Sequence, residues 1–224
     1  MTNRGGASIE RREGKESMRR ALSLIALLPV VLTACSLNHR PTLSPTRMAE
    51  FWEEPADFAQ RDLLHGPGGA ALAPDPNESY VLLEVDTTGF SRGYDVRDGT
   101  GRKWSVKLGP ESRTEVVVSR IVWAMGYHQP YVYYLPHWTL NENGKLRTEG
   151  SARFRLSSTQ KNLGVWSWRN NPFLDTQPFA GLFVLMTILN NWDIKSQQNA
   201  VYRFEREGQD PRERYVIKDL GASL

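Results

Sequence analysis

Apolar and polar residues alternate through much of the segment between residues 80 and 156, at the two-residue spacing that is typical of β-strands. In residues 103–108, Trp104, Val106 and Leu108 fall on one face, and the side chains between them are polar. Further β-forming runs, bounded by glycine, proline or polar turns, occur at residues 80–85, 94–98, 131–135 and 152–156. The pattern predicts a sheet of several strands, with a tight hairpin at Gly99-Thr100-Gly101 and another turn around Gly144.

A helical spacing replaces the alternation in residues 113–125. Val118, Val122 and Met125 share one stripe of this predicted helix with Glu115. A carboxylate on an apolar face is costly unless it has a partner. Lys107, on the strand just before the helix, is the nearest candidate in sequence, so we expect a salt bridge between Lys107 and Glu115.

A second helix is predicted over residues 179–189, which are apolar on every side. Its composition indicates a buried central helix, and it is too short to span a membrane. The polar loop 190–199 follows, and then two β-like runs, 200–204 and 214–218, joined by a turn. Because these runs have the lengths of a hairpin, we expect the loop and the residues after the second run to converge in space.

The N-terminus has the pattern of an export signal. Met18-Arg19-Arg20 precedes an apolar run over residues 21–32, and Leu32-Thr33-Ala34-Cys35 follows. The last four residues resemble a bacterial lipobox, whose cysteine is lipidated and becomes the mature N-terminus. Cys35 is the only cysteine of the chain, which excludes an internal disulfide. We therefore predict a lipoprotein signal peptide at residues 1–34 and lipidation of Cys35.

The next segment, residues 35–76, is rich in proline, glycine, alanine and polar residues and has little periodicity. This composition predicts a flexible tether, with one short helical piece near residues 46–53. Residues 1–34 hold six of the 28 Lys/Arg and three of the 25 Asp/Glu, which leaves 22 charges of each sign in the mature chain. That balance argues against nucleic acid as a partner.

The loop 190–199 and the end of the last strand carry side chains that suit phosphoryl transfer. The loop presents Asp193 and Asn199, and Asp219 directly follows the strand 214–218. One carboxylate can orient an attacking hydroxyl, while the amide and the second carboxylate hold Mg²⁺ against the phosphates. The alternative is that these residues only cap a helix and form turns.

Together with the strand lysine and the helix glutamate, this order resembles the protein-kinase-like superfamily, and its atypical branches more than the ordinary protein kinases. The resemblance runs from about Tyr80 to Gly221. It implies an α+β, protein-kinase-like fold with an antiparallel upper-lobe sheet and one helix in residues 77–160. Residues 161–224 would form an incomplete helical lower lobe, truncated or minimal after Asp219-Leu220-Gly221.

The resemblance also implies roles for single residues in the upper lobe. Gly89 and Gly93 match the positions where such folds carry a loop over the phosphates, although an ordinary hairpin explains this glycine pair as well. Lys107 matches the strand lysine that contacts the α- and β-phosphates, and Glu115 matches the helix glutamate that pairs with it.

In the lower lobe, Asp193 matches the catalytic-loop acid, and Asp219 matches the metal-binding acid. The metal-binding amide would be Asn199 or its neighbour. In the family this amide usually lies five residues after the acid, and Gln198 occupies that position here.

The function implied is that of a membrane-anchored envelope lipoprotein with a kinase-like fold, an ATP-dependent phosphotransferase that uses ATP and Mg²⁺. The alternative is a non-enzymatic, pseudokinase-like lipoprotein that uses the fold to bind an envelope protein partner. Ser36 lacks the aspartate that would retain a Gram-negative lipoprotein in the inner membrane. The expected location is therefore the periplasmic face of the outer membrane, with lipidated Cys35 in the membrane.

Overall fold

The computed structural model describes residues 43–87, 91–204 and 210–224. All of them belong to one compact unit. The predicted signal peptide, the lipidation site Cys35 and the phosphate-loop glycine Gly89 lie outside the described residues.

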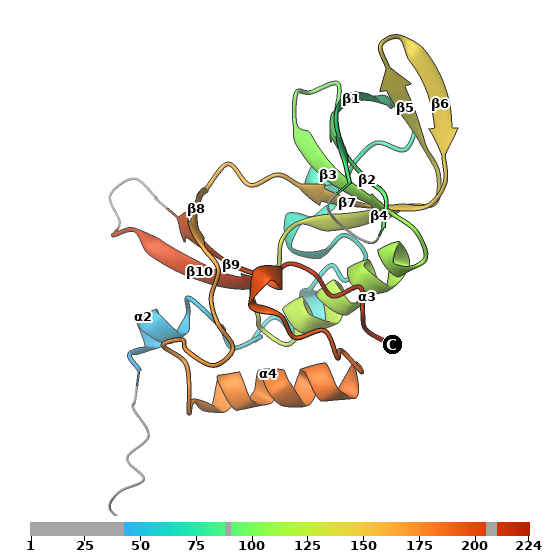
Figure 1. Ribbon diagram of the computed structural model, residues 1–224. Helices are drawn as coiled ribbons and strands as arrows, with labels where there is room; N and C mark the ends of the chain where they lie inside the picture. The colour runs from blue at the N-terminus through green and yellow to red at the C-terminus, as the bar shows by residue number, and fades with distance from the viewer. Residues whose placement is uncertain (1–42, 88–90, 205–209) are drawn as a thin grey trace, which may run out of the picture. The chain divides into compact units, whose positions relative to one another are not determined.

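A seven-stranded sheet forms the first half of the described unit (Figure 1). Its strands lie in the order β4-β7-β3-β2-β1-β5-β6. Their bounds are Ser79–Asp86 (β1), Gly93–Arg97 (β2), Lys103–Leu108 (β3), Val132–Leu135 (β4), Trp138–Glu142 (β5), Lys145–Glu149 (β6) and Ala152–Leu156 (β7). Neighbouring strands pair antiparallel, except that β1 and β5 pair parallel. The alternating pattern thus located five of these strands.

The hairpin of β5 and β6 was predicted only as a turn around Gly144. Asn143 and Gly144 both have positive φ, at 54° and 87°, as a two-residue hairpin turn requires. β6 is exposed along nearly its whole length, so its sequence carries no apolar alternation from which a strand could be predicted.

Helix α3 (Glu111–Ala124) packs against β3, β4 and β7. Val118 and Val122 of the predicted stripe are fully buried, and so is Glu115, whereas Met125 is exposed at the helix end. The inner face of the sheet encloses a core of its own, rich in aromatic rings: Tyr80, Tyr94, Trp104, Tyr133, Trp138 and Phe154.

The second half of the unit contains helix α4 (Gln177–Ile188) and a three-stranded sheet in the order β10-β9-β8. The strands are Lys161–Gly164 (β8), Asn199–Phe204 (β9) and Arg212–Ile217 (β10). β9 and β10 pair antiparallel, which confirms the predicted return of the chain as a hairpin. A second aromatic and aliphatic core lies in this half and includes Val118 and Val122 of α3 and Phe51.

Helix α4 begins two residues before the predicted start at 179. The Thr176 side chain caps it by accepting a hydrogen bond from the Phe179 N–H, and Pro178 lies in the first turn. The prediction of a buried central helix is correct for one face of α4 and wrong for the other. Phe179, Leu182 and Met186 face the core, but Val184 and Ile188 are 59% and 72% exposed. Within the described residues, only one face of this apolar helix is covered.

Segment 43–73 is not the flexible tether that its composition predicted. Phe51 is buried in the second core, where its ring stacks on Phe173 with centroids 4.7 Å apart. Further along, the Tyr133 hydroxyl donates to the Gly69 carbonyl at 3.1 Å. The prediction failed because the apolar residues of this segment are too widely spaced to give a period, although the folded unit buries Phe51 and partly buries Met48, Trp52 and Leu72.

The segment contains four short helical turns: Pro45–Met48 (α2), Phe58–Gln60 (η1), Gly66–Gly68 (η2) and Ala70–Leu72 (η3). A fifth turn, Ser196–Gln198 (η4), precedes β9. No helix in the described part of the chain has the length and apolarity needed to cross a bilayer. The observed class is mixed α+β, with sheets predominating over helices.

Candidate functional site

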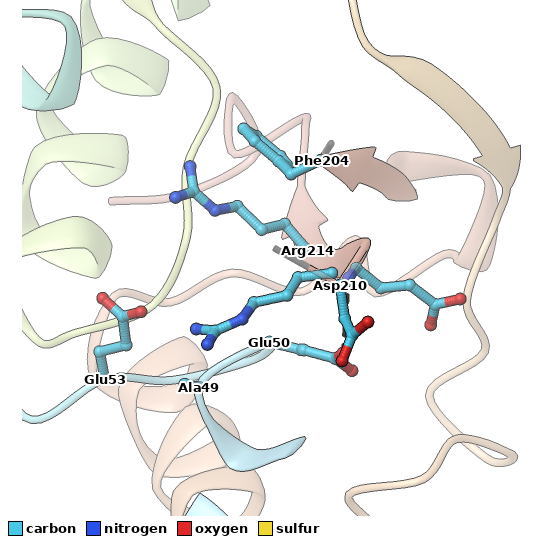
Figure 2. Close-up of a pocket in the computed structure, with 8 residues that line it drawn as sticks. Ala49, Glu50, Glu53, Phe204, Asp210 and Arg214 are labelled. Atoms are coloured by element: carbon cyan, nitrogen blue, oxygen red, sulfur yellow. Dashed lines mark hydrogen bonds between the residues drawn. The ribbon is translucent and has the colours of Figure 1, made fainter. Parts of the chain in front are cut away.

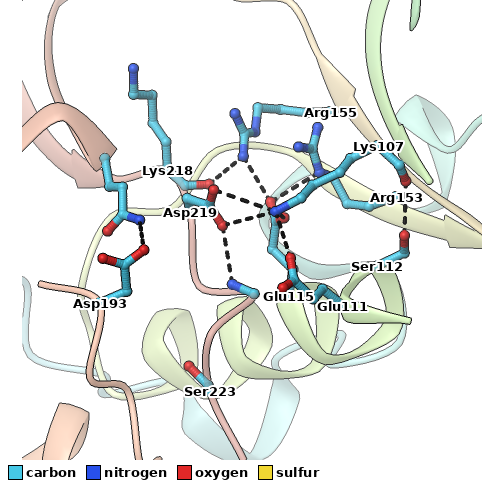
Figure 3. Close-up of polar contacts among 12 residues, drawn as sticks. Lys107, Glu111, Ser112, Glu115, Arg153, Arg155, Asp193, Lys218, Asp219 and Ser223 are labelled. Carbon is cyan, nitrogen blue, oxygen red and sulfur yellow. Dashed lines mark hydrogen bonds and ion pairs between the residues drawn. The ribbon is translucent and has the colours of Figure 1, made fainter. Parts of the chain in front are cut away.

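The Lys107 ammonium lies among three carboxylates (Figure 3). Its Nζ is 3.0 Å from Glu111 Oε2, 3.5 Å from Asp219 Oδ1 and 3.8 Å from Glu115 Oε2. Strand β3 supplies the lysine, the first two turns of α3 supply both glutamates, and Asp219 follows β10. The predicted Lys107–Glu115 salt bridge is confirmed, although it is the longest of the three. Burial alone would lower the pKa of Lys107, but the three carboxylates raise it, so the amine stays charged.

Glu115 has closer partners than Lys107. It is only 1% exposed, and its Oε1 lies 2.7 Å from Arg155 Nη2 and 2.9 Å from Arg153 Nε. Both arginines come from β7, and Arg153 also donates to the Ser105 carbonyl at 2.9 Å. Burial lowers the pKa of Arg153 to about 10, which still leaves it charged at neutral pH. A buried glutamate is thus surrounded by three cations.

Asp219 is held from both sides. Lys107 approaches its carboxylate, and the Gly221 N–H donates to Asp219 Oδ1 at 3.1 Å. Burial alone would raise the pKa of Asp219, but Lys107, the Gly221 amide, Arg155 and Arg153 together lower it. The pKa of Asp219 is therefore lowered, because its charged neighbours are cations and not a second carboxylate.

Gly93 is placed on β2 directly opposite Lys107 of β3, and opposite Asp86 of β1. A Cβ at this position would lie 3.1 Å from the Val106 carbonyl oxygen and 3.2 Å from the Asp86 Cβ. Glycine thus allows the three strands to approach closely beside the lysine. Its partner in the predicted loop, Gly89, is outside the described residues.

The loop before β9 places Asp193 near an amide, but the amide is that of Gln198. Gln198 Nε2 donates to Asp193 Oδ2 at 2.7 Å, and Lys195 Nζ lies 2.8 Å from Asp193 Oδ1. Asn199 is fully buried instead, and its Nδ2 donates to the Trp166 carbonyl at 3.0 Å. As the first residue of β9, Asn199 has its side chain in the core, where its Oδ1 has no hydrogen-bond partner among the described residues.

The segments that carry the two predicted acids are neighbours. The Lys218 N–H donates to the Gln198 carbonyl at 2.6 Å, and the Gln198 side chain holds Asp193. Asp219 is the next residue after Lys218. The residues drawn in Figure 3 therefore form two groups, one around Lys107 and one around Asp193, which are joined through the 198–218 backbone contact.

Sequence reasoning missed Glu111, Arg153 and Arg155. Glu111 was outside the predicted helix, whose start was placed two residues too late. The sequence does contain a signal for the arginines. In β7 they alternate with Ala152, Phe154 and Leu156, so both arginines lie on one face of the strand. Two charges on one face of a strand that pairs on both sides require buried partners, and Glu115 is that partner.

A separate cavity of about 290 Å³ lies away from this cluster, and Figure 2 shows it. Glu50, Glu53 and Glu213 contribute carboxylates to its lining, and Arg212 and Arg214 contribute guanidiniums. Asp210 adds a fourth carboxylate to the lining. Arg47 pairs with both Glu50 and Glu213, and the Arg214 guanidinium lies over the Phe204 ring. We interpret this cavity as a space left where segment 43–53 packs against strands β9 and β10.

Comparison with known proteins finds no relative: no family model, no curated protein and no solved structure matches the chain. Among the described residues, no group of three or more His, Cys, Asp or Glu side chains is arranged to hold a metal ion. The functional assignment therefore rests on the geometry of the cluster around Lys107.

Proposed function

We propose that this chain has a kinase-like fold and binds ATP with Mg²⁺ at the Lys107 cluster, as a phosphotransferase. One observation carries the proposal. A strand lysine, a helix glutamate and a strand-end aspartate meet within 4 Å, although 112 residues separate Lys107 from Asp219. Such a meeting of like and unlike charges is costly to desolvate, and it is typical of functional sites.

The Lys107–Asp219 pair suits a ligand that carries both signs. The side chains are 18% and 35% exposed, so both can be reached from solvent. In the proposal, Lys107 binds phosphate oxygens, and Glu115 with Glu111 orients it. Asp219 is one oxygen ligand for the cation. When bound, Mg²⁺ would neutralise charge on the phosphates.

The residues around Asp193 complete the proposal only in part. Asp193 is the proposed base that orients the acceptor hydroxyl. In the proposal, Gln198 takes the place expected for Asn199, because its amide contacts Asp193, while that of Asn199 is in the core. The metal ligand would be Gln198 Oε1, which accepts a hydrogen bond from the Lys195 N–H at 3.4 Å. The fit is thus good for the phosphates and for one metal ligand, and poorer for the amide.

The test is a thermal shift with Mg-ATP. Ligand at a hundredfold excess over its dissociation constant adds about 2.7 kcal/mol, or about 5–11 °C in melting temperature for a chain of this size. Asp219→Ala should abolish the shift, while Glu142→Ala, which removes an exposed carboxylate of β5, should retain it. Absence of a shift in the wild-type protein at millimolar Mg-ATP would refute nucleotide binding.

A second candidate function is a binding module without catalysis. The observation that favours it is the uncovered face of α4, with Val184 and Ile188, and the neighbouring Trp192, which is 75% exposed. Apolar surface of this kind commonly marks a protein contact. This function would be favoured over the first if the wild-type protein bound a protein partner but showed no thermal shift with Mg-ATP. The Ile188→Asp variant should then lose the partner.

The cellular location remains part of the proposal. We propose that Cys35 is lipidated and anchors the folded unit to the periplasmic face of the outer membrane. The support is the sequence pattern around Cys35 alone.

A further inference from the structure

Arg155, like Lys107, contacts residues on both sides of the proposed site. Its Nη2 donates to Glu115 Oε1 at 2.7 Å and also to the Lys218 carbonyl. Glu115 belongs to α3, Arg155 to β7, and Lys218 to the segment that leads into Asp219. One guanidinium nitrogen thus joins the sheet and its helix to the second half of the unit (Figure 3).

The Lys218 carbonyl requires a hydrogen-bond donor from outside the sheet, and Arg155 supplies it. Strand β10 ends at Ile217, so the carbonyl of Lys218 has left the ladder with β9. Its N–H is taken by the Gln198 carbonyl at 2.6 Å, and its C=O by Arg155. The residue before Asp219 is therefore held between the Asp193 loop on one side and the Glu115 pair on the other.

The acceptors around residue 155 explain why an arginine occupies this position. Glu115 is fully buried. Arg153 Nε lies 2.9 Å from Glu115 Oε1 without forming a hydrogen bond, and Arg153 donates through Nη1 to the Ser105 carbonyl. The hydrogen bond to Glu115 Oε1 comes from Arg155 Nη2, whose two N–H groups can serve one acceptor each, at a reach that the shorter lysine side chain lacks.

We infer that Arg155 is a positioning residue for Asp219: it fixes the Lys218 peptide relative to Glu115, and so holds the Asp219 carboxylate beside Lys107. The expected effect of Arg155 on ligand binding rests on the proposed function. The contact that Arg155 makes between Glu115 and segment 218–221 does not depend on a ligand. Arg155 itself touches neither nucleotide nor metal in this proposal.

The first experiment measures the tie in the ligand-free protein. Hydrogen exchange of the amides of residues 218–221 is compared between wild type, Arg155→Met and Arg155→Lys, at low denaturant where local opening dominates. Arg155→Met should accelerate exchange at these amides at least tenfold more than at those of β4. Arg147→Met, which removes an exposed arginine from β6, is the matched control and should leave residues 218–221 unchanged.

The second experiment measures Mg-ATP dissociation constants of the same proteins well below their melting temperatures, so that a general loss of stability does not contribute. Displacing a metal ligand through its outer partner typically weakens binding by about 10- to 100-fold, and we expect that loss in Arg155→Met. Arg155→Lys keeps the charge near Glu115 and should recover part of the affinity. Arg147→Met should bind as the wild type does.

The outcomes separate the two proposals. Unchanged exchange at residues 218–221 in Arg155→Met would overturn the positioning role, whatever the protein binds. Unchanged Mg-ATP affinity in Arg155→Met, with binding lost in Asp219→Ala, would also overturn it while leaving the proposed function intact. If the wild-type protein does not bind Mg-ATP, the proposed function is refuted. Faster hydrogen exchange at residues 218–221 in Arg155→Met would still support the role of Arg155 in holding this segment to Glu115.

Discussion

Glu115→Gln is the substitution that tests the charge cluster most directly. The side chain keeps its shape but loses its charge at a site that is 1% exposed and has cations at 2.7, 2.9 and 3.8 Å. Arg153, itself only 5% exposed in its side chain, then has no remaining carboxylate within ion-pair distance among the described residues. The substitution leaves a buried cation without its partner.

The magnitude follows from that unpaired charge. Removing one partner of a buried ion pair costs about 3–5 kcal/mol, because the other charge stays desolvated. For a domain of this size, this corresponds to a fall of about 6–20 °C in melting temperature. Lys107→Met should cost less, since Glu115 then retains both arginines, and Lys107 is partly in contact with solvent.

The assay is urea denaturation of wild type, Glu115→Gln and Lys107→Met, followed by tryptophan fluorescence. The midpoint should fall with the slope unchanged, in the order wild type, Lys107→Met, Glu115→Gln. Glu142→Gln is the matched control, because it makes the same change at an exposed ion pair with Arg147, and should leave the midpoint where it is. A larger loss for Lys107→Met than for Glu115→Gln would refute the view that the arginines are the main partners of Glu115.

Three further predictions concern other parts of the chain. Phe51→Ala should lower the free energy of unfolding by about 3–5 kcal/mol in urea denaturation, because it empties a core position, while the exposed Phe58→Ala should have little effect. Burial lowers the pKa of His128 below its ordinary 6.5, so its contribution is present above that value and lost as the pH falls. The melting temperature should therefore fall more in wild type than in His128→Gln from about pH 7.5 to about pH 5.5. Cys35→Ser should release the protein from the membrane fraction, as measured by fractionation of cells.

Each of these has a contrary outcome. Equal stability of Phe51→Ala and Phe58→Ala would mean that segment 43–53 is a tether after all. Parallel pH profiles of wild type and His128→Gln would show that other groups cause the acid sensitivity. Unchanged membrane association of Cys35→Ser would reject the lipid anchor.

The sequence by itself determined most of the regular elements. The alternation in β3, the stripe on α3 and the cap of α4 are local properties, because strand and helix periods are set by neighbours within a few residues. The position of Lys107 on β3 and of Glu115 on α3 followed from those periods, and so did their proximity, since the two elements are consecutive.

The tertiary structure alone decided what surrounds that pair. Arg155 lies 40 residues from Glu115, and Asp219 lies 112 residues from Lys107, so no local pattern relates them. Sheet order brings β7 next to β3, and only this pairing turns the arginines of β7 toward a glutamate of α3. Which residue pairs with a buried charge is decided by the topology of the fold and cannot be deduced from composition.

The same distinction explains the parts of the chain that were predicted wrongly. A helix composed of apolar residues is buried only where other elements cover it, so the exposure of Ile188 could not be deduced from α4 itself. Conversely, Phe51 stands alone in a polar segment, and its burial depends on Phe173 and Tyr127, which come from distant parts of the chain. Asn199 and Gln198 are adjacent in sequence, yet the amide of Asn199 lies in the core and that of Gln198 lies beside Asp193, because Gln198 ends the turn η4 and Asn199 begins β9.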